Sequence, residues 1–305
     1  MNLSRSSMLA ADPLSDALGV LGAECIRRTR LEAAGAWALA FPAKKRLKLV
    51  ALRRGGCWIL LPDQPPRLLT TGDVFLIGNT RYTMASRPEV PAIDGTVLYA
   101  ENRSDVARLG GEETELLGGE IAFAGEDPSF LLDALPVFLG MEGASPSAAA
   151  VTRMLDLLDA EVGCKRMGAR LVASRLGEVL LVEAIRAFVA DQGESCVGWI
   201  GALGDRHIGE ALRLMHGEVD RPWTVATLAA RVGMSRSAFS LHFARRVGRP
   251  PLDYLTRWRM MLARRRLREG RSDVASVSLE VGYTSQSAFS QAFKRTFGHS
   301  PKHSL

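Results

Sequence analysis

Two similar segments in the last hundred residues carry side chains that suit hydrogen bonding to nucleic-acid bases. SRSAFSLHFARR begins at Ser235, and SQSAFSQAFKRT begins at Ser285. Gln can pair with the edge of adenine, Arg with that of guanine, and a serine hydroxyl with bases or phosphates. In each segment two phenylalanines four residues apart mark the buried face of a helix, so the polar side chains face outward. For each of these side chains the alternative is a solvated helix face. The candidates are Arg236, Ser237, Ser240, Arg245, Ser285, Gln286, Ser287, Ser290, Gln291, Lys294 and Arg295.

These segments are the second halves of an internal repeat. TVATLAARVGMS (224–235) resembles DVASVSLEVGYTS (273–285), and SAFSLHFARRVGRPP (237–251) resembles SAFSQAFKRTFGHSP (287–301), with an offset of 49 residues before the turn and 50 after it. Each copy has a helix-capping residue, an apolar helix face, a glycine that permits a left-handed turn and a serine that can cap a second helix. This order predicts two helix-turn-helix units. The cap and turn positions are Thr224, Gly233 and Ser235 in the first copy and Asp273, Gly282 and Ser285 in the second.

The segment between the copies, residues 251–270, predicts a helix that holds the two units at a fixed separation. Its six arginines could contact phosphates or pair with carboxylates such as Asp253 and Glu269. Phosphate contacts make affinity depend on salt without adding sequence information. We expect this role for Arg265. The apolar face is expected to consist of Leu252, Leu255, Trp258 or Met261, and Leu262.

Basic residues concentrate in the same region. From Asp205 to Leu305 there are 18 Lys and Arg against 8 Asp and Glu, whereas the first 204 residues hold 21 against 25. A basic third on a mildly acidic body suggests a nucleic-acid module joined to a part that does not touch nucleic acid. A solvated basic face is the alternative.

Residues 205–301 resemble the DNA-binding domain of the AraC/XylS family of bacterial regulators. GYTSQSAFSQAFKRTFGHSP (282–301) matches that family's second unit in the aromatic residue after the glycine, the two phenylalanines and the terminal Gly-x-x-Pro. The resemblance implies that the second helix of each unit enters the major groove of double-stranded promoter or operator DNA, and that activation proceeds through RNA polymerase. The base-facing set that it implies is Arg236, Ser237, Ser240, Leu241, Gln286, Ser287 and Gln291.

The N-terminal part predicts mainly short strands. The β-rich runs 47–52, 57–61 and 73–77 are separated by Gly- and Pro-containing turns, and a polar loop over 101–120 leads into a further strand at 119–124. This pattern favours a sandwich or barrel. GGCWILLPDQPPRLLTTGDVFLIGNTRYTM (55–84) is similar to the cupin-type sensor domain of many AraC/XylS members, and the similarity extends over about residues 20–125.

Helical patterns follow the strands. Pro128–Gly140, the i, i+3, i+4, i+7 pattern from Val151 and the run Ala169–Ala190 predict helices, and the last should bury most of its surface against the barrel or a second subunit. We expect an α+β protein. A cupin-like β-barrel with a helical connector and dimerisation helices occupies residues 20–200, and an all-α tandem helix-turn-helix domain occupies 205–305. A homodimer is expected.

Residues for catalysis are scarce in the first 204 positions. All five histidines lie beyond residue 205, which excludes a histidine-held metal in the barrel. The four cysteines are far apart, and Cys57 is better explained as a buried structural thiol than as a nucleophile. We therefore expect no enzyme activity, no metal and no cofactor. Because the sequence has neither a signal peptide nor a long uncharged apolar run, we expect a cytoplasmic protein without membrane contact.

A sensor function needs only a concave apolar pocket with a few polar groups, and a small barrel offers one. The cluster Lys44-Lys45-Arg46-x-Lys48 could meet an acidic ligand or be solvated. A small-molecule effector would favour one arrangement of the DNA-binding parts. The alternatives are control by a protein partner or by abundance, and an enzyme domain fused to a DNA-binding module. The candidate lining residues, each of which could also be ordinary core, are Trp37, Phe41, Trp58, Phe75 and Tyr82.

Overall fold

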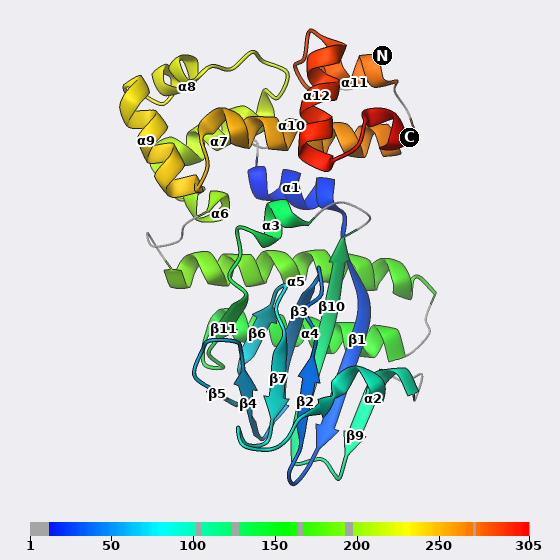
Figure 1. Ribbon diagram of the computed structural model, residues 1–305. Helices are drawn as coiled ribbons and strands as arrows, with labels where there is room; N and C mark the ends of the chain where they lie inside the picture. Colours follow the sequence, from blue (N-terminus) through cyan, green and yellow to red (C-terminus); the bar gives the residue numbers. More distant parts are fainter. Residues whose placement is uncertain are drawn as a thin grey trace. The chain divides into compact units, whose positions relative to one another are not determined.

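The computed structural model describes residues 12–101, 105–123, 128–163, 167–192, 198–270 and 273–304. The chain divides into two compact units, and each is described here by itself (Figure 1). The sheet unit spans Gly22–Asp191. The helical unit combines the segment that ends at Leu21 with the chain from Gln192 onward.

Two hydrogen-bonded sheets form the body of the sheet unit. The larger has the strand order β11-β6-β3-β10-β1-β9, and the smaller has the order β5-β4-β7-β2-β8. Neighbouring strands are antiparallel except for the β1–β9 and β2–β8 pairs. The strands are β1 Ala23–Ala33, β2 Ala38–Phe41, β3 Leu47–Arg54, β4 Gly56–Leu60, β5 Arg67–Thr70, β6 Val74–Ile77, β7 Tyr82–Ala85, β8 Ile93–Asp94, β9 Val106–Leu109, β10 Thr114–Phe123 and β11 Phe138–Met141.

The core of this unit lies between the two sheets. Because side chains alternate along a strand, each strand contributes every second residue to the interior. Leu52 and Phe75 of the larger sheet and Leu39 and Ile59 of the smaller one are at most 1% exposed and belong to one cluster. This arrangement agrees with the expected cupin-like, α+β fold, with the strands divided between two sheets.

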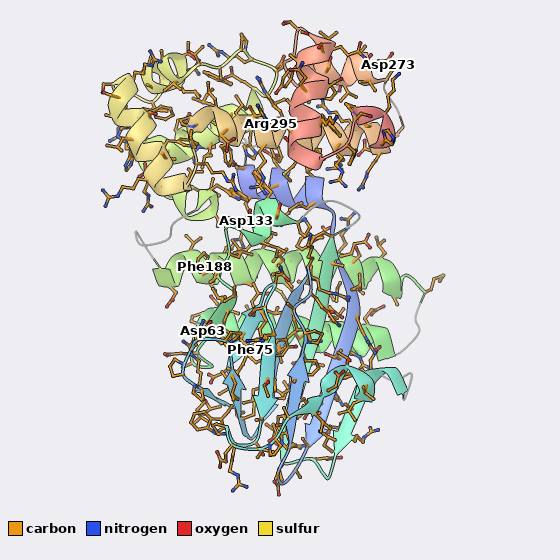
Figure 2. The ribbon with its side chains drawn as sticks, viewed as in Figure 1. Asp63, Phe75, Asp133, Phe188, Asp273 and Arg295 are labelled. Carbon is orange, nitrogen blue, oxygen red and sulfur yellow. The ribbon has the colours of Figure 1, made fainter. Side chains whose placement is uncertain are left out.

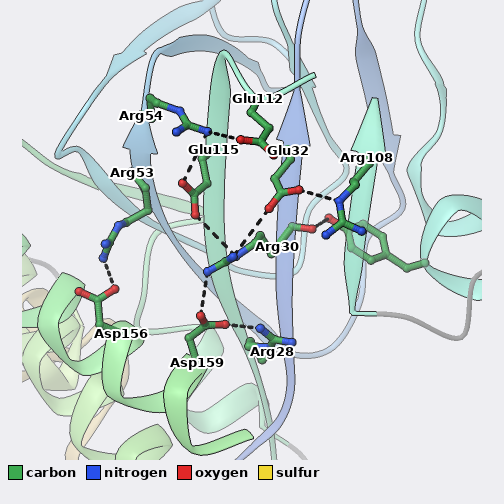
Figure 3. A network of polar contacts seen from close by, with 11 residues as sticks. Arg28, Arg30, Glu32, Arg53, Arg54, Arg108, Glu112, Glu115, Asp156 and Asp159 are labelled. Atoms are coloured by element: carbon green, nitrogen blue, oxygen red, sulfur yellow. Dashed lines mark hydrogen bonds and ion pairs between the residues drawn. The ribbon is translucent and has the colours of Figure 1, made fainter. Parts of the chain in front are cut away.

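Helix α4 (Pro146–Gly163) covers the outer face of the larger sheet, and helix α5 (Ala169–Gln192) approaches it at Gly177, where an added Cβ would lie 2.7 Å from the Cβ of Cys25. A network of ion pairs joins α4 to the strands (Figure 3). Asp159 accepts hydrogen bonds from Arg28 and, at 2.8 Å, from Arg30. Charged side chains on the outer face of the sheet therefore hold helix α4 in place through ion pairs.

Two expected elements of this unit are wrong. The polar loop predicted over 101–120 contains β9 and the first part of β10, because its glycines at 118 and 119 serve close packing inside a sheet and not a turn. The helix predicted over Pro128–Gly140 is reduced to α3 (Ser129–Leu132), since Phe138–Met141 pair with β6 as an edge strand. Helix α2 (Gly95–Glu101) was not expected either.

Among the described residues, the helical unit consists of α1 and the seven helices α6 to α12, with a final 3-10 turn at Pro301–Ser304. Helix α1 packs against α7 and α10, and α6 packs against α9, where Trp199 and Ile200 are buried. Residues 193–197, which precede α6, lie outside the described residues. The helices are α1 Pro13–Leu21, α6 Trp199–Ala202, α7 Arg206–Gly217, α8 Val225–Arg231, α9 Arg236–Val247, α10 Pro251–Arg268, α11 Val274–Glu280 and α12 Gln286–Phe297.

The predicted central helix is confirmed as α10, but its buried surface is wider than one face. Leu252 is 40% exposed, whereas Tyr254, Met260 and Leu267 are at most 1% exposed. The expectation that Leu252 belongs to the core is wrong. Helix α10 contacts α9, α11, α12 and α1, so its buried residues do not follow a single face. A single-face pattern does not describe a helix that is surrounded in this way.

A buried histidine links α7 to α10. The ring of His216 stacks on Trp258 with ring centres 4.0 Å apart, and its Nε2 lies 2.9 Å from the hydroxyl of Tyr254. Its Nδ1 lies 3.5 Å from the carboxylate of Asp16 on α1. Burial lowers the pKa of His216, although the Asp16 carboxylate opposes this shift.

We expect His216 to make the helical unit less stable in mild acid. Its pKa in the folded state is below the unfolded value of about 6.5, so the unfolded chain binds the proton more tightly. The free energy of unfolding should therefore fall as the pH drops below about 6.5 and be insensitive to this group above it. Urea denaturation of the full chain at pH 5.5 and pH 7.5 measures the difference. It should shrink in His216→Gln but not in the exposed control His303→Gln; an equal pH response in both variants would contradict the assignment.

Candidate functional site

Hydrogen bonds local to each repeat define its first and second helices. In the first copy the hydroxyl of Thr224 accepts from the Thr227 N–H at 3.1 Å, and the hydroxyl of Ser235 accepts from the Ala238 N–H at 3.3 Å. In the second copy Asp273 and Ser285 accept from the N–H groups three residues later in the same manner. The two predicted helix-turn-helix units, α8–α9 and α11–α12, are therefore confirmed with their caps.

The second helix of each unit has one buried face and one open face. Phe239 and Phe243 of α9 and Phe289 and Phe293 of α12 are completely buried. Leu241 on the open face of α9 is 74% exposed, which leaves an apolar group able to contact a thymine methyl. Arg295, at the end of α12, is exposed (Figure 2). The other exposed candidates are Arg236, Ser237, Arg245, Ser285, Gln286, Ser287, Gln291 and Lys294, while Ser240 and Ser290 are half-buried.

Arg265 occupies a different environment from the one expected. Its guanidinium donates to the Glu269 carboxylate at 2.9 Å and to the backbone carbonyl of Gly19 on α1 at 2.5 Å. Both acceptors are protein groups, so Arg265 helps to hold α1 in this geometry, and its contact with phosphate stays a prediction. Arg266 is paired with Glu280 at 2.6 Å. The arginines of α10 therefore brace the unit to a greater extent than the sequence suggests.

A cavity opens between the two sheets of the sheet unit. The larger sheet supplies Thr29 and Lys48, and the smaller sheet supplies the stacked rings of Phe41 and Tyr82, whose centres are 5.0 Å apart. Tyr99 of α2 completes the wall. The cavity itself measures about 100 Å³.

Comparison with known proteins relates both sites to one family. A cupin model matches residues 12–190, and a helix-turn-helix domain model matches residues 228–305. An AraC-like transcription regulator of Streptomyces lividans is 37% identical over 293 residues, which cover 95% of this chain and 96% of the relative. The chain belongs to the AraC family of transcription regulators. It is thus a DNA-binding regulator with a cupin-like N-terminal domain, as the resemblance implied.

Further relatives of this AraC-family regulator differ more in sequence. The HTH-type transcriptional regulator AlkR of Acinetobacter baylyi is 29% identical over 280 residues, or 88% of this chain and 90% of the relative. A structure of ToxT from Vibrio cholerae covers 91% of this chain and 96% of that chain, with 12% identity and a TM-score of 0.35.

Of the five expected lining residues, three surround the cavity of the regulator. Phe41, Phe75 and Tyr82 line it, and Phe75 lies among the strands (Figure 2). Trp37 is buried in the same core, but it lines a hollow near Pro91 at another place. Trp58 lies on the face of β4 opposite to the buried Cys57 and Ile59. The sequence predicts that this tryptophan faces inward, but the register of β4 places it on the other face.

Most of the polar residues that line the cavity were not among the residues predicted from the sequence. Thr29 on β1, Glu120 on β10 and Tyr99 on α2 line it together with Lys48, which the basic run at 44–48 did indicate. The signal that could have found Thr29 and Glu120 is the alternation of β1 and β10, but their pairing is set by contacts about ninety residues apart. Register of this kind is decided by the folded sheet.

Burial shifts the pKa values of the titratable groups around this cavity. The pKa of Lys48 is lowered to about 8 by burial, although Glu120 opposes the shift. Burial raises the pKa of Tyr99 to about 12. The ammonium of Lys48 donates to the hydroxyl of Thr29, and the Glu120 carboxylate lies 2.9 Å from Arg46. At neutral pH the cavity thus holds a charged lysine beside neutral hydroxyls.

The thiols within the described residues have no activating environment. Cys57 is buried, and burial raises the pKa of its thiol to about 12; burial also raises the pKa of Cys25. A thiol in such surroundings stays protonated and is a poor nucleophile. Cys164 and Cys196 lie outside the described residues.

The described ranges of the chain contain no group of three or more His, Cys, Asp or Glu side chains arranged to hold a metal ion. Nor do they contain a helix whose length and hydropathy would let it cross a membrane.

Proposed function

We propose that this AraC-family regulator reads its operator with the outward faces of α9 and α12 and is controlled by a small molecule bound between the two sheets. The observation that carries the first part is the duplication of one exposed polar face on two capped helices, with α10 packed against both units. Two reading helices held by one rigid helix suit two successive major-groove segments on one side of DNA.

Within this proposal the first turn of each reading helix makes the base contacts. The N-terminal residues of a recognition helix are those that reach base edges. Arg236 and Ser237 hold these positions in α9, and Gln286 and Ser287 hold them in α12. Ser240, Leu241, Ser290 and Gln291 follow one turn later, and Arg245, Lys294 and Arg295 near the helix ends would contact phosphates.

Replacing Gln286 with alanine is expected to remove a preference for particular bases in one half of the site. A bidentate Gln–adenine contact is worth about 1–3 kcal/mol of discrimination. Lys294→Ala is the matched control on the same helix, because loss of a phosphate contact should weaken binding to all sequences alike and reduce the salt slope by about 1.

Selection of bound sequences from random DNA with the full-length protein measures both effects. The same selection reports half-site spacing and so the geometry of the bound protein. An unchanged sequence profile for Gln286→Ala would show that α12 docks differently from our proposal. A profile that changes equally in Lys294→Ala would contradict the division between base-reading and phosphate-contacting residues.

The small-molecule part of the proposal is supported by the cavity between the sheets. A thermal-shift screen of a metabolite library should yield a compound that stabilises the protein, because a ligand that binds only the folded state raises its stability. The full chain is the right material, since the segment that ends at Leu21 belongs to the helical unit and would be separated from it in an N-terminal fragment. Control by a protein partner or by abundance predicts no such compound.

We also propose that the regulator is a cytoplasmic homodimer that acts through RNA polymerase and has no catalytic activity. Leu157 of α4 and Leu171, Val172 and Val179 of α5 are 43–64% exposed, and covering such large apolar side chains favours association. Sedimentation at micromolar concentration tests this, with Leu171→Glu expected to shift the protein to the monomer.

A further inference from the structure

The inner face of the larger sheet changes from apolar to charged along the strands. Three rows cross β3, β10 and β1 at successive inward-facing positions, and the strand register defines each row. The first row is Leu52, Leu116 and Leu31; the second is Val50, Gly118 and Thr29; the third is Lys48, Glu120 and Arg27. A molecule lying along the strands would therefore meet an apolar end and a charged end.

A glycine in the middle row lets the two polar side chains lie close against β10. A Cβ at Gly118 would lie 3.1 Å from the Thr29 hydroxyl and 3.2 Å from Cε of Lys48. Any larger residue would therefore crowd Lys48 and Thr29, and glycine keeps these two side chains together in the cavity wall. The aromatic pair of Phe41 and Tyr82 lines the opposite side of the cavity.

Positive charge dominates the polar end. Arg27, Lys44, Arg46 and Lys48 line the cavity there, together with the carboxylate of Glu120. Arg46 already faces Glu120 at 2.9 Å, and Arg27 faces Asp105 at 2.7 Å. Lys48 donates to a neutral hydroxyl, that of Thr29. A buried ammonium whose hydrogen-bond partner is neutral is stabilised strongly by an anion placed beside it.

We propose that the effector is an amphipathic organic anion, with its acid group held by Lys48 and Thr29 and its apolar part lying against Val50, Phe75 and the Phe41–Tyr82 pair. This inference rests on the proposed function, since it names the chemical class of the molecule that the sensor binds. A neutral apolar ligand would add no negative charge beside the Lys48 ammonium, whose acidic neighbour Glu120 also faces Arg46. A cationic ligand would meet like charges at the same end.

The apolar part of the ligand occupies the inner end of the cavity. Val50 and Phe75 lie side by side on β3 and β6, and both are at most 7% exposed. The same register places Ile77 beside Lys48, one row nearer to the charged end. The separation of two rows along the strand, about 7 Å, fits a short apolar body joined to one acid group.

The test compares four probes of one shape on the full-length protein. They are 4-phenylbutyrate, its neutral amide, the neutral alcohol 4-phenyl-1-butanol and the cation 4-phenylbutylammonium. Isothermal titration gives each affinity. The acid should bind at least about 10-fold more tightly than either neutral analogue, which corresponds to one charge-assisted hydrogen bond, and the cation should bind most weakly.

Two variants test whether Lys48 is the residue that holds the acid group of the ligand. Lys48→Met keeps the length of the side chain and should lose the preference for the acid while still binding the alcohol. Lys45→Met removes the same charge from the same segment, but Lys45 does not line this cavity and the preference should persist. Equal affinity for acid and amide in the wild-type protein would overturn the anionic class while leaving the sensor function standing. Failure of all four probes, together with a blank metabolite screen, would overturn both.

Discussion

Replacing Gly282 with alanine is expected to destabilise the helical unit by roughly 2–5 kcal/mol, whereas the same change at Gly233 should cost only about 1–2 kcal/mol. The two glycines occupy the same place in the two repeats, and both have a positive φ, +80° and +72°. The free-energy cost of placing an alanine at a positive φ is therefore similar in the two variants. At Gly282 a Cβ would also lie 2.5 Å from the carbonyl oxygen of Asp220, while at Gly233 no atom lies within 4 Å.

Urea denaturation of the two variants measures the difference between the repeats directly. The variants carry the same chemical change in the same kind of turn, so what remains after subtraction is the cost of the close approach to Asp220. Equal losses of stability would show that the loop 218–224 does not press on the second turn. In that case the backbone at Asp220 would move away from the added Cβ without loss of stability.

This close approach explains how the first unit supports the second. Arg259 of α10 donates to the backbone carbonyls of Val219 at 2.8 Å and Arg221 at 2.6 Å, and its guanidinium lies over the ring of Tyr283. One arginine thus joins the loop after α7 to the turn of the second repeat. The spacing of the reading helices α9 and α12 is fixed by contacts of this kind as well as by α10.

The parts of the structure that the sequence predicted are those encoded over short distances. A cap such as Ser285, a turn such as Gly282 and the pair Phe289 and Phe293 act within a dozen residues, so the repeat could be placed to the residue. The fold class of the N-terminal part followed from its strands and turns. Whether Trp58 faces inward depends on the pairing of β4 with β5 and β7, which local sequence does not determine.

The segments whose structure was predicted wrongly show the same difference between short-range and long-range information. Residues 106–123 contain four glycines and were expected to be mainly loop, yet β10 is paired on both sides by β1 and β3. The phosphate contact of Arg265 stays a prediction, but the sequence pattern gives no sign of its hydrogen bond to the carbonyl of Gly19, which is 246 residues away in the chain. Tertiary contacts of this length are outside the reach of pattern analysis.

Phe289→Ala is expected to cost about 3–5 kcal/mol, the usual loss for removing a buried phenyl ring. Phe289 is completely buried in a cluster formed by α10, α11 and α12, where Tyr283 and Phe293 contact its ring. A loss of this size is a large fraction of the stability of a domain. Hydrogen exchange followed by mass spectrometry should show loss of protection in α11 and α12.

The counterpart Phe239→Ala decides whether the two repeats are separate cooperative units. Phe239 is as deeply buried as Phe289, but α9 packs against α6, α7 and α8 as well as α10, and Phe239 is not part of the cluster around Phe289. Each variant should therefore lose exchange protection mainly in its own repeat, and in a DNA footprint each should lose the half of the site read by its own second helix. If either variant lost protection in all helices from α7 to α12 together, α10 would have to be the centre of one indivisible core, and the two reading helices would respond to any effector only as a single rigid body.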